Sequence, residues 1–335
     1  MELRAALIGC GDVSTIHFEA FDAIDYIKLV AVCDTDPNRL AAAVERTGAK
    51  GYSSVEELLS DKQNFDVVHV TTPHFDHADT VVACLEAGVN VIMEKPLAHT
   101  LADGQRIIDA ADNSSAKIGV CLQNRYNVSS QQMRRVLDEG LLGDITGGFA
   151  QVVWTRSLAY YERRLWRGTW QGSGGGVLIN QALHTLDLLQ WFLGPVTKLR
   201  GRAQTLKFAD VIEVEDTASA FLTHESGVQS SFYATLTPPI DHPVEIEIIG
   251  TKGRAVIRDG LTVYGDDGSL TTYPERKVPS CGRAYWGVSH DVFIRDFYES
   301  LDDPEPFWIG PREAMESLRI LKEIYAQSPE MAAHN

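Results

Sequence analysis

The stretch that decides the fold is Leu7-Ile8-Gly9-Cys10-Gly11-Asp12-Val13-Ser14, near the start of the chain. It follows a short apolar run typical of a buried strand and precedes residues with helical spacing. Gly9 permits a tight turn, and Gly11 lets a pyrophosphate approach the backbone without a Cβ in the way. The helix start offers N–H groups and a partial positive charge to that anion. We therefore predict a bound dinucleotide, with contacts from Gly9, Gly11, Asp12 and Val13.

Two further residues fit the dinucleotide-binding pattern, and the second of them bears on the choice of cofactor. Ser14 takes the third small position of the Gly-x-Gly-x-x-Gly pattern and is small enough for close packing of helix on strand. Asp34 stands at the end of the next apolar run, where a carboxylate accepts hydrogen bonds from the adenosine ribose. The same carboxylate repels a 2′-phosphate. The sequence therefore favours NAD over NADP, with NADP kept as the alternative.

Outward from this turn, the first ~120 residues alternate between short apolar runs and helical patterns, which indicates βαβ units around a parallel sheet. The expected strands are 5–8, 29–33, 67–71, 89–93 and 118–122. We expect a Rossmann dinucleotide-binding domain over residues 1–125.

The pattern changes near residue 145, where longer runs with alternating polarity are separated by turn signals, as in a largely antiparallel sheet. The expected strands are 149–155, 196–206, 217–223, 229–235, 244–250 and 255–258, and the expected helices are 178–193, 288–301 and 311–326. Residues 126–335 are therefore predicted to form an α+β domain for substrate binding and oligomerisation.

Composition narrows the function classes. The 335 residues include 46 acidic and 30 basic side chains, a net charge of −16. This balance argues against a nucleic-acid or anionic-membrane partner, which needs a basic surface. No run approaches the roughly 18 apolar residues of a spanning helix. The five cysteines show no CxxC spacing, so we expect buried thiols in a reducing compartment and no metal site. We also expect a cytoplasmic protein without a secretory leader.

Three motifs, in this order, identify a family. They are Val70-Thr71-Thr72-Pro73-His74-Phe75-Asp76-His77, Met93-Glu94-Lys95-Pro96-Leu97 and Gly174-Gly175-Gly176-x3-Asn180-x3-His184-x2-Asp187. Together they strongly resemble the Gfo/Idh/MocA oxidoreductases, relatives of glucose–fructose oxidoreductase and inositol dehydrogenase. The resemblance covers nearly the whole chain, including the change from βαβ units to an antiparallel sheet.

The resemblance implies catalytic roles for three residues. Lys95 matches the lysine that lies beside the nicotinamide and the reacting hydroxyl, and its bond to Pro96 matches the family's cis peptide. His184 matches the acid–base histidine, and imidazole exchanges protons near neutral pH. Asn180 departs from the commoner aspartate: it can orient a hydroxyl but cannot take up a proton. Either Lys95 or His184 can be the immediate base.

Further contacts follow from the same resemblance. Those to the cofactor are expected from Asp34, Thr71, Thr72, Pro73, His77, Glu94, Lys95, Gln123, Trp166 and Arg167, and those to the substrate from Lys95, Arg125, Tyr126, Tyr161, Asn180 and His184. Tyr160, Tyr161, Arg163 and Arg164 can line a sugar pocket or an oligomer contact. The segment 285–290 resembles one near the family's pocket mouth, and Asp187 is expected to be a structural partner.

The implied activity is NAD(P)-dependent oxidation of a secondary hydroxyl of a sugar, polyol or sugar derivative. Three alternatives stay open: a nucleotide-sugar dehydrogenase, an NAD-dependent glycosidase-like enzyme that releases no NADH, and a non-catalytic dinucleotide-sensing regulator. Retention of both Lys95 and His184 favours an enzyme. The antiparallel sheet usually pairs with another subunit in this family, so a homodimer or homotetramer is expected.

Overall fold

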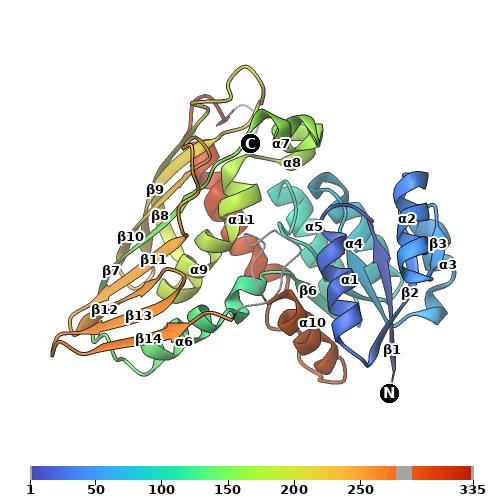
Figure 1. Cartoon of the computed structure of the whole chain (residues 1–335), viewed down its shortest axis with the longest axis horizontal. Helices are drawn as coiled ribbons and strands as arrows, with labels where there is room; N and C mark the ends of the chain where they lie inside the picture. Colours follow the sequence, from blue (N-terminus) through green and yellow to red (C-terminus); the bar gives the residue numbers. More distant parts are fainter. Residues whose placement is uncertain (1, 277–288, 333–335) are drawn as a thin grey trace. The chain divides into compact units, whose positions relative to one another are not determined.

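The computed structural model describes residues 2–276 and 289–332 (Figure 1). The chain divides into two compact units. The first comprises Met1–Gln123 and Ser289–Met315, and the second comprises Asn124–Val288 and Glu316–Asn335. The returning segment Ser289–Met315 thus belongs to the same unit as the N-terminal βαβ region.

The first unit is built on a six-stranded parallel sheet in the order β3-β2-β1-β4-β5-β6. Its strands are β1 (Leu3–Ile8), β2 (Ile27–Cys33), β3 (Lys50–Tyr52), β4 (Val67–Val70), β5 (Asn90–Met93) and β6 (Ile118–Val120). The order reverses between β1 and β4, the switch point of a Rossmann fold, which confirms the predicted class. Strand β3 was not predicted, because only Tyr52 of its three residues is buried.

The described helices of this unit are α1 (Ser14–Ala23), α2 (Pro37–Thr47), α3 (Val55–Ser60), α4 (His77–Glu86), α5 (Leu101–Asp112), α10 (His290–Glu299) and the first turn of α11 (Pro311–Ala326), with 3-10 turns η1 (Lys62–Asn64) and η2 (His74–Asp76). Among them, side chains cap the starts of α2, α3 and α5. Asp36 caps the start of α2, and Gly48 ends it in the left-handed conformation. A Cβ on Gly119 would lie 2.8 Å from the Phe297 ring, so the returning segment packs directly on β6.

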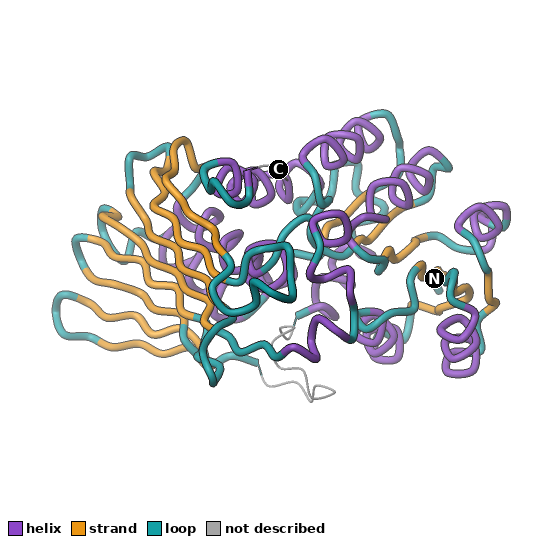
Figure 2. Tube along the Cα trace, turned by 90° about the horizontal axis from the view of Figure 1, so that it is seen from above, coloured by secondary structure: helices purple, strands orange, loops and turns teal. Residues whose placement is uncertain are grey.

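The second unit is built on an eight-stranded sheet in the order β14-β13-β12-β11-β7-β10-β9-β8. Its strands are β7 (Ile145–Val153), β8 (Val196–Gln204), β9 (Thr217–His224), β10 (Gln229–Thr235), β11 (Glu245–Gly250), β12 (Gly253–Ile257), β13 (Gly260–Gly265) and β14 (Leu270–Pro274). Figure 2 shows them side by side. Only the β7–β10 pair is parallel, which confirms the predicted largely antiparallel sheet. Strands β13 and β14 were missed because they bury few side chains.

Among the described residues, helices of this unit cover one face of the sheet and none covers the other (Figure 1). They are α6 (Val128–Asp138), α7 (Leu158–Glu162), α8 (Trp170–Ser173), α9 (Leu183–Leu193) and the rest of α11, with short turns η3 (Gln123–Tyr126), η4 (Leu165–Gly168) and η5 (Leu178–Ala182). On the covered face, a Cβ on Gly148 would contact Leu193 of α9, and one on Gly201 would contact Ile324 of α11. The predicted helices 178–193 and 311–326 are present.

The three glycines before η5 form a turn that other residues could not form. A Cβ on Gly175 would lie 2.1 Å from the Tyr325 hydroxyl, and one on Gly176 would lie 1.8 Å from the Glu215 carbonyl oxygen. The Glu215 carboxylate, fully buried, accepts the N–H groups of Gly176 (2.8 Å) and Leu178 (2.9 Å) and the Tyr325 hydroxyl (2.8 Å). A buried carboxylate therefore fixes the start of the helix that carries Asn180 and His184.

Burial raises the pKa of Glu215 to about 7, against the lowering effect of the hydrogen bonds from Leu178, Tyr325 and Gly176. A carboxyl whose pKa is raised on folding stabilises the protein below its unfolded pKa of 4.5, and this contribution is lost as the pH rises through about 7. We expect the unfolding free energy of the wild type, relative to Glu215→Gln, to fall between about pH 5 and about pH 7.5.

The comparison can be made in urea with tryptophan fluorescence, because all tryptophans except Trp308 lie in the second unit. Burial also lowers the pKa of Lys322, to about 8, so this neighbour stays protonated over most of the window. Parallel pH profiles for the two proteins would contradict the prediction.

Candidate active site

The predicted cofactor residues of the first unit lie where neighbouring strands end. Gly9 to Val13 follow β1, Asp34 follows β2, Thr71 to Pro73 follow β4, and Glu94 and Lys95 follow β5. Because the strands are parallel, these loops share the carboxyl edge of the sheet, where α/β proteins bind their ligands. The fold therefore brings these sequence-predicted residues to one edge.

The glycine turn after β1 fits against the loop after β4. Gly9 adopts a φ of +95°, and a Cβ there would lie 2.8 Å from the backbone of Thr71 and Thr72. The Thr71 hydroxyl donates to the Gly9 carbonyl oxygen (2.5 Å). Nothing lies within 4 Å of the position that a Cβ on Gly11 would take. Gly9 is thus required by the protein itself, whereas Gly11 leaves open space in front of α1.

Asp34 ties the turn after β1 to the turn after β2. Its carboxylate accepts the N–H of Cys10 through Oδ2 and the N–H of Asp36 through Oδ1, each at 2.8 Å. Helix α1 begins after Val13 with no side-chain cap on its first N–H groups, and the space in front of Gly11 is open. Open space, backbone donors and an acceptor carboxylate together fit a pyrophosphate followed by a ribose.

His77 holds two of these loops together. Its ring is fully buried, with Nδ1 2.8 Å from the Pro96 carbonyl oxygen and Nε2 3.0 Å from the Thr72 carbonyl oxygen. Burial lowers the pKa of His77, and the two carbonyls oppose that shift. The structure thus puts this predicted cofactor residue within hydrogen-bond distance of both loops, and a neutral imidazole donates its one N–H to either carbonyl.

Lys95 follows β5 as a half-buried side chain, and its peptide bond to Pro96 is cis, as the resemblance implied. The preceding Glu94 is buried and accepts the Lys95 backbone N–H through Oε2 (3.3 Å). Gln123, predicted to contact the cofactor, follows β6 and is 1% exposed. These residues belong to the first unit.

Asn180 and His184 belong to the second unit, on the helix that follows the glycine turn. Residues Leu178–Ala182 form a π turn, wider than the regular helix that the sequence predicted, and π turns are frequent at functional sites. The Asn180 amide donates to the carbonyl oxygens of Gly175 and Gly176, both at 3.2 Å. His184 follows in the first turn of α9 and is half-buried.

Arg125 forms a buried ion pair with Asp187. The guanidinium donates through Nε (2.9 Å) and Nη2 (2.8 Å) to the two carboxylate oxygens, and both side chains are 1% exposed. The pair ties the segment before α6 to α9, so Asp187 has the structural role expected of it. Arg125, predicted to contact substrate, uses these donors inside the unit, while Tyr126 beside it is half-buried.

The aromatic residues before the glycine turn divide into two groups. Tyr161 is 4% exposed and packs edge-on against Phe208. Tyr160 instead accepts a hydrogen bond from Gln181 of η5 (2.8 Å), and the Arg167 guanidinium lies 4.6 Å from its ring centre. Trp166 and Arg167 lie in η4 and are half-buried. Tyr160 therefore hydrogen-bonds the residue that directly follows Asn180 in the chain.

Some residues in these arrangements were missed by sequence reasoning. Glu215 and Tyr325 hold the glycine turn from distant parts of the chain. His17, Glu94 and Cys121 bring three metal-ligand types within 4.8 Å of one another, although no metal site was expected. The sequence carried no sign of this cluster beyond the helical spacing that places His17 on the apolar face of its helix. Of the segment 285–290, residues 285–288 lie outside the described residues.

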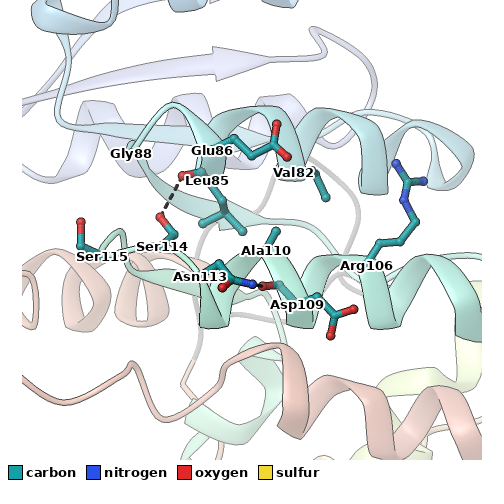
Figure 3. Close-up of a pocket in the computed structure, with 10 residues that line it drawn as sticks. All are labelled: Val82, Leu85, Glu86, Gly88, Arg106, Asp109, Ala110, Asn113, Ser114 and Ser115. Atoms are coloured by element: carbon teal, nitrogen blue, oxygen red, sulfur yellow. Dashed lines mark hydrogen bonds between the residues drawn. The ribbon is translucent and has the colours of Figure 1, made fainter.

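A surface pocket of about 590 Å³ lies between α4 and α5 (Figure 3). Gly88 and Ser115, which line it, precede β5 and β6, so the pocket is at the amino edge of the sheet. The predicted site residues that follow β1, β2, β4 and β5 lie at the opposite, carboxyl edge of that sheet, and no predicted site residue lines the pocket. No helix within the described ranges is long and apolar enough to cross a membrane.

Comparisons with known proteins give the family of the chain and of its two domains. Residues 3–122 match the model of the GFO/IDH/MocA oxidoreductase family with an NAD-binding Rossmann fold, and residues 130–256 match the GFO/IDH/MocA C-terminal domain. An inositol 2-dehydrogenase of Salmonella paratyphi B is 34% identical, covering 90% of this chain and 87% of the relative. A D-apiose dehydrogenase of Paraburkholderia graminis is 30% identical, covering 80% and 71%.

A solved structure gives a further match. The WlbA dehydrogenase from Bordetella pertussis, in complex with NADH and UDP-GlcNAcA, is 31% identical with a TM-score of 0.84, covering 98% of this chain and 96% of that one. The resemblance seen in the sequence, the fold class and the NAD-binding domain are thereby confirmed. This chain belongs to the Gfo/Idh/MocA family of oxidoreductases, with an N-terminal NAD-binding Rossmann fold.

Proposed function

We propose that this protein is an NAD-dependent dehydrogenase that oxidises a secondary hydroxyl of a sugar, a polyol or a sugar derivative. Two observations carry the proposal together. The glycine turn after β1 leaves open space at Gly11, and Lys95 follows β5 at the same edge of the sheet. The relatives named as inositol 2-dehydrogenase and D-apiose dehydrogenase support the substrate class.

In this proposal residues 1–125, on which the returning segment Ser289–Met315 packs, bind most of the dinucleotide, and the remainder of residues 126–335 binds the substrate. Gly9, Gly11, Asp12 and Val13 hold the pyrophosphate, and Asp34 holds the ribose. Further cofactor contacts come from Thr71, Thr72, Pro73, His77, Glu94, Lys95, Gln123, Trp166 and Arg167. NAD remains favoured over NADP because a carboxylate at the end of β2 repels a 2′-phosphate.

The proposed chemistry separates a hydride from a proton. A bound NAD supplies the hydride acceptor. Lys95 hydrogen-bonds the substrate hydroxyl, and Lys95 with His184 takes up the O–H proton as the carbonyl forms. Asn180 orients the substrate through its amide. Arg125, Tyr126 and Tyr161 complete the proposed substrate residues, with Arg125 acting through the helix it holds by its ion pair with Asp187.

A nucleotide sugar is the second candidate substrate. The Bordetella pertussis WlbA structure, similar over 98% of this chain, is named as a complex with UDP-GlcNAcA. Arg163 is exposed and Arg164 half-exposed beside η4, so they offer charge for a diphosphate. The choice between a simple sugar and a nucleotide sugar is therefore an outcome of the substrate test below.

We further propose that the protein is a homo-oligomer in the cytoplasm. The open face of the second sheet exposes Phe221 (73%), Tyr233 (38%) and Ile249 (42%), each alternating with buried residues of the covered face. Large apolar side chains exposed on an open sheet face are typical of subunit contacts. Free thiols at Cys10, Cys33, Cys84 and Cys121 support a reducing compartment.

The two glycines of the turn should respond differently to alanine. Gly9→Ala places a Cβ against the Thr71–Thr72 backbone and should lower the melting temperature of the free protein. Gly11→Ala has room and should leave that temperature unchanged, but should weaken NAD binding because the methyl group fills the pyrophosphate position. Calorimetric titration with NAD measures this, and unchanged affinity in Gly11→Ala would contradict the assignment.

Removal of Lys95 or His184 should lower the rate of substrate oxidation. We expect Lys95→Ala and His184→Ala each to reduce kcat by about 10²–10⁴-fold while NAD still binds. The assay follows NADH absorbance with inositols, pentoses, hexoses and UDP-sugars, with NAD and NADP in parallel. His242→Ala, at an exposed position, is the control and should retain activity.

Several outcomes would overturn the proposal. Full activity of Lys95→Ala would remove Lys95 from the mechanism. Absence of NADH formation with every substrate, together with tight NAD binding, would favour a regulator. Glycoside cleavage without NADH release would favour the glycosidase-like alternative.

An aspartate on the open sheet face should break the oligomer. Phe221→Asp puts a charge at the most exposed of the three apolar positions and should reduce the mass measured by light scattering to that of one chain. Leu101→Asp, at an exposed position of α5 in the first unit, is the control. A wild type of single-chain mass, or an unchanged mass for Phe221→Asp, would contradict this interface.

A further inference from the structure

A row of buried polar side chains in the first unit connects Tyr298 of α10 to Glu94. The Tyr298 hydroxyl lies 3.0 Å from His69 Nε2, His69 Nδ1 lies 2.9 Å from His17 Nδ1, and His17 Nε2 lies 3.2 Å from Glu94 Oε1. None of these four side chains is more than 6% exposed. We call His17, His69 and Tyr298 the buried relay.

The acceptor at its end fixes the direction of every hydrogen bond in the relay. An ionised Glu94 can only accept, so His17 must carry its proton on Nε2. A neutral His17 then accepts at Nδ1, which makes His69 the donor through its own Nδ1. His69 Nε2 is left as an acceptor for the Tyr298 hydroxyl. One arrangement of protons therefore satisfies all the groups.

Burial supports this neutral arrangement. It lowers the pKa of both His17 and His69, and it raises the pKa of Tyr298 well above its usual range, so the phenol keeps its proton. Burial also favours a protonated Glu94, but hydrogen bonds from His17 and His290 hold the pKa of that carboxyl well below its usual range. The charges and the bond directions agree with each other.

Glu94 is held from three directions. His17 of α1 and His290 of α10 each lie 3.2 Å from Oε1, and the buried Cys121 thiol is a further partner. The other oxygen, Oε2, accepts the backbone N–H of Lys95 at 3.3 Å. Because its donors come from separate elements packed around β5, the carboxylate has one orientation available. The bond to Lys95 depends on that orientation.

We propose that the buried relay positions Lys95: Tyr298 orients His69, His69 orients His17, and His17 holds Glu94 so that it fixes the Lys95 backbone. The inference rests on the proposed role of Lys95 in hydroxyl oxidation. The three relay residues are almost fully buried and act through Glu94, so they are positioning residues. Small displacements of a reacting group cost up to about 10²-fold in rate, so a fixed backbone matters.

The first test compares variants of His17 in the whole enzyme. His17→Leu removes the donor to Glu94 and should lower kcat by about 10- to 100-fold with little change in the KM for NAD. His17→Gln carries an amide N–H at the reach of the imidazole Nε2 and should recover much of that loss. His224→Leu is the matched control, because His224 is equally buried in the second unit and bonds Gly194 and Ser230. It should lower the melting temperature without lowering kcat.

Coupling along the relay gives a second readout. Tyr298→Phe removes one hydroxyl and should reduce kcat several-fold in the wild type. In the His17→Leu background it should have no further effect on kcat, because the connection to Glu94 is already broken. Independent, multiplicative effects on kcat would overturn the relay, as would equal kcat losses in His17→Leu and His17→Gln.

The proton arrangement itself can be measured without any substrate. In protein labelled with ¹⁵N-histidine, NMR at neutral pH should show His17 protonated on Nε2 and His69 on Nδ1. Protonation of His17 on Nδ1 would overturn the relay. Stoichiometric zinc in the purified protein would do the same, because a metal on His17 Nε2, Glu94 and Cys121 needs the reverse tautomer.

These measurements separate the two hypotheses. The NMR result tests the relay independently of whether a sugar is oxidised. If a sugar is oxidised but His17→Leu matches His224→Leu in kcat, the relay fails and the proposed function stands.

Discussion

The structure of the first unit depends on the close approach of two backbone turns at the point where strand order reverses. Strand β1 pairs with β2 on one side and with β4 on the other, and all run parallel. The turn after β1 therefore meets the loop after β4, and the contact at Gly9 is too close for any Cβ. Because the strands end together, the loops that carry Gly11, Asp34 and Lys95 share one edge.

Each unit uses a buried carboxylate to hold a backbone turn that carries proposed catalytic residues. Glu94 accepts the N–H of Lys95, and Glu215 accepts the N–H groups of Gly176 and Leu178 ahead of Asn180 and His184. Their electrostatics differ. Imidazole donors hold the pKa of Glu94 low, whereas burial raises that of Glu215 to about 7. The same side chain thus serves as a permanent anion in one unit and as a titrating group in the other.

Sequence patterns predicted those elements whose burial is periodic and whose ends carry turn residues. The five strands expected in the first half and the six expected in the second are all present. The patterns failed for β3, β13 and β14, which bury few of their side chains and so lack a periodic apolar signal. They also failed for η5, because the i→i+5 backbone bonds of a short π turn leave no distinct apolar spacing in the sequence.

The sequence alone determined the family, the parallel and antiparallel halves, and the candidate residues, because motifs and periodicity are local in the chain. Only the tertiary structure decided what these residues contact. It put Arg125 in a buried ion pair with Asp187, buried Tyr161 against Phe208, and joined Glu94 to His17 and His69 to Tyr298. Such partners lie tens to hundreds of positions apart, and which of them meet depends on packing that no local pattern encodes.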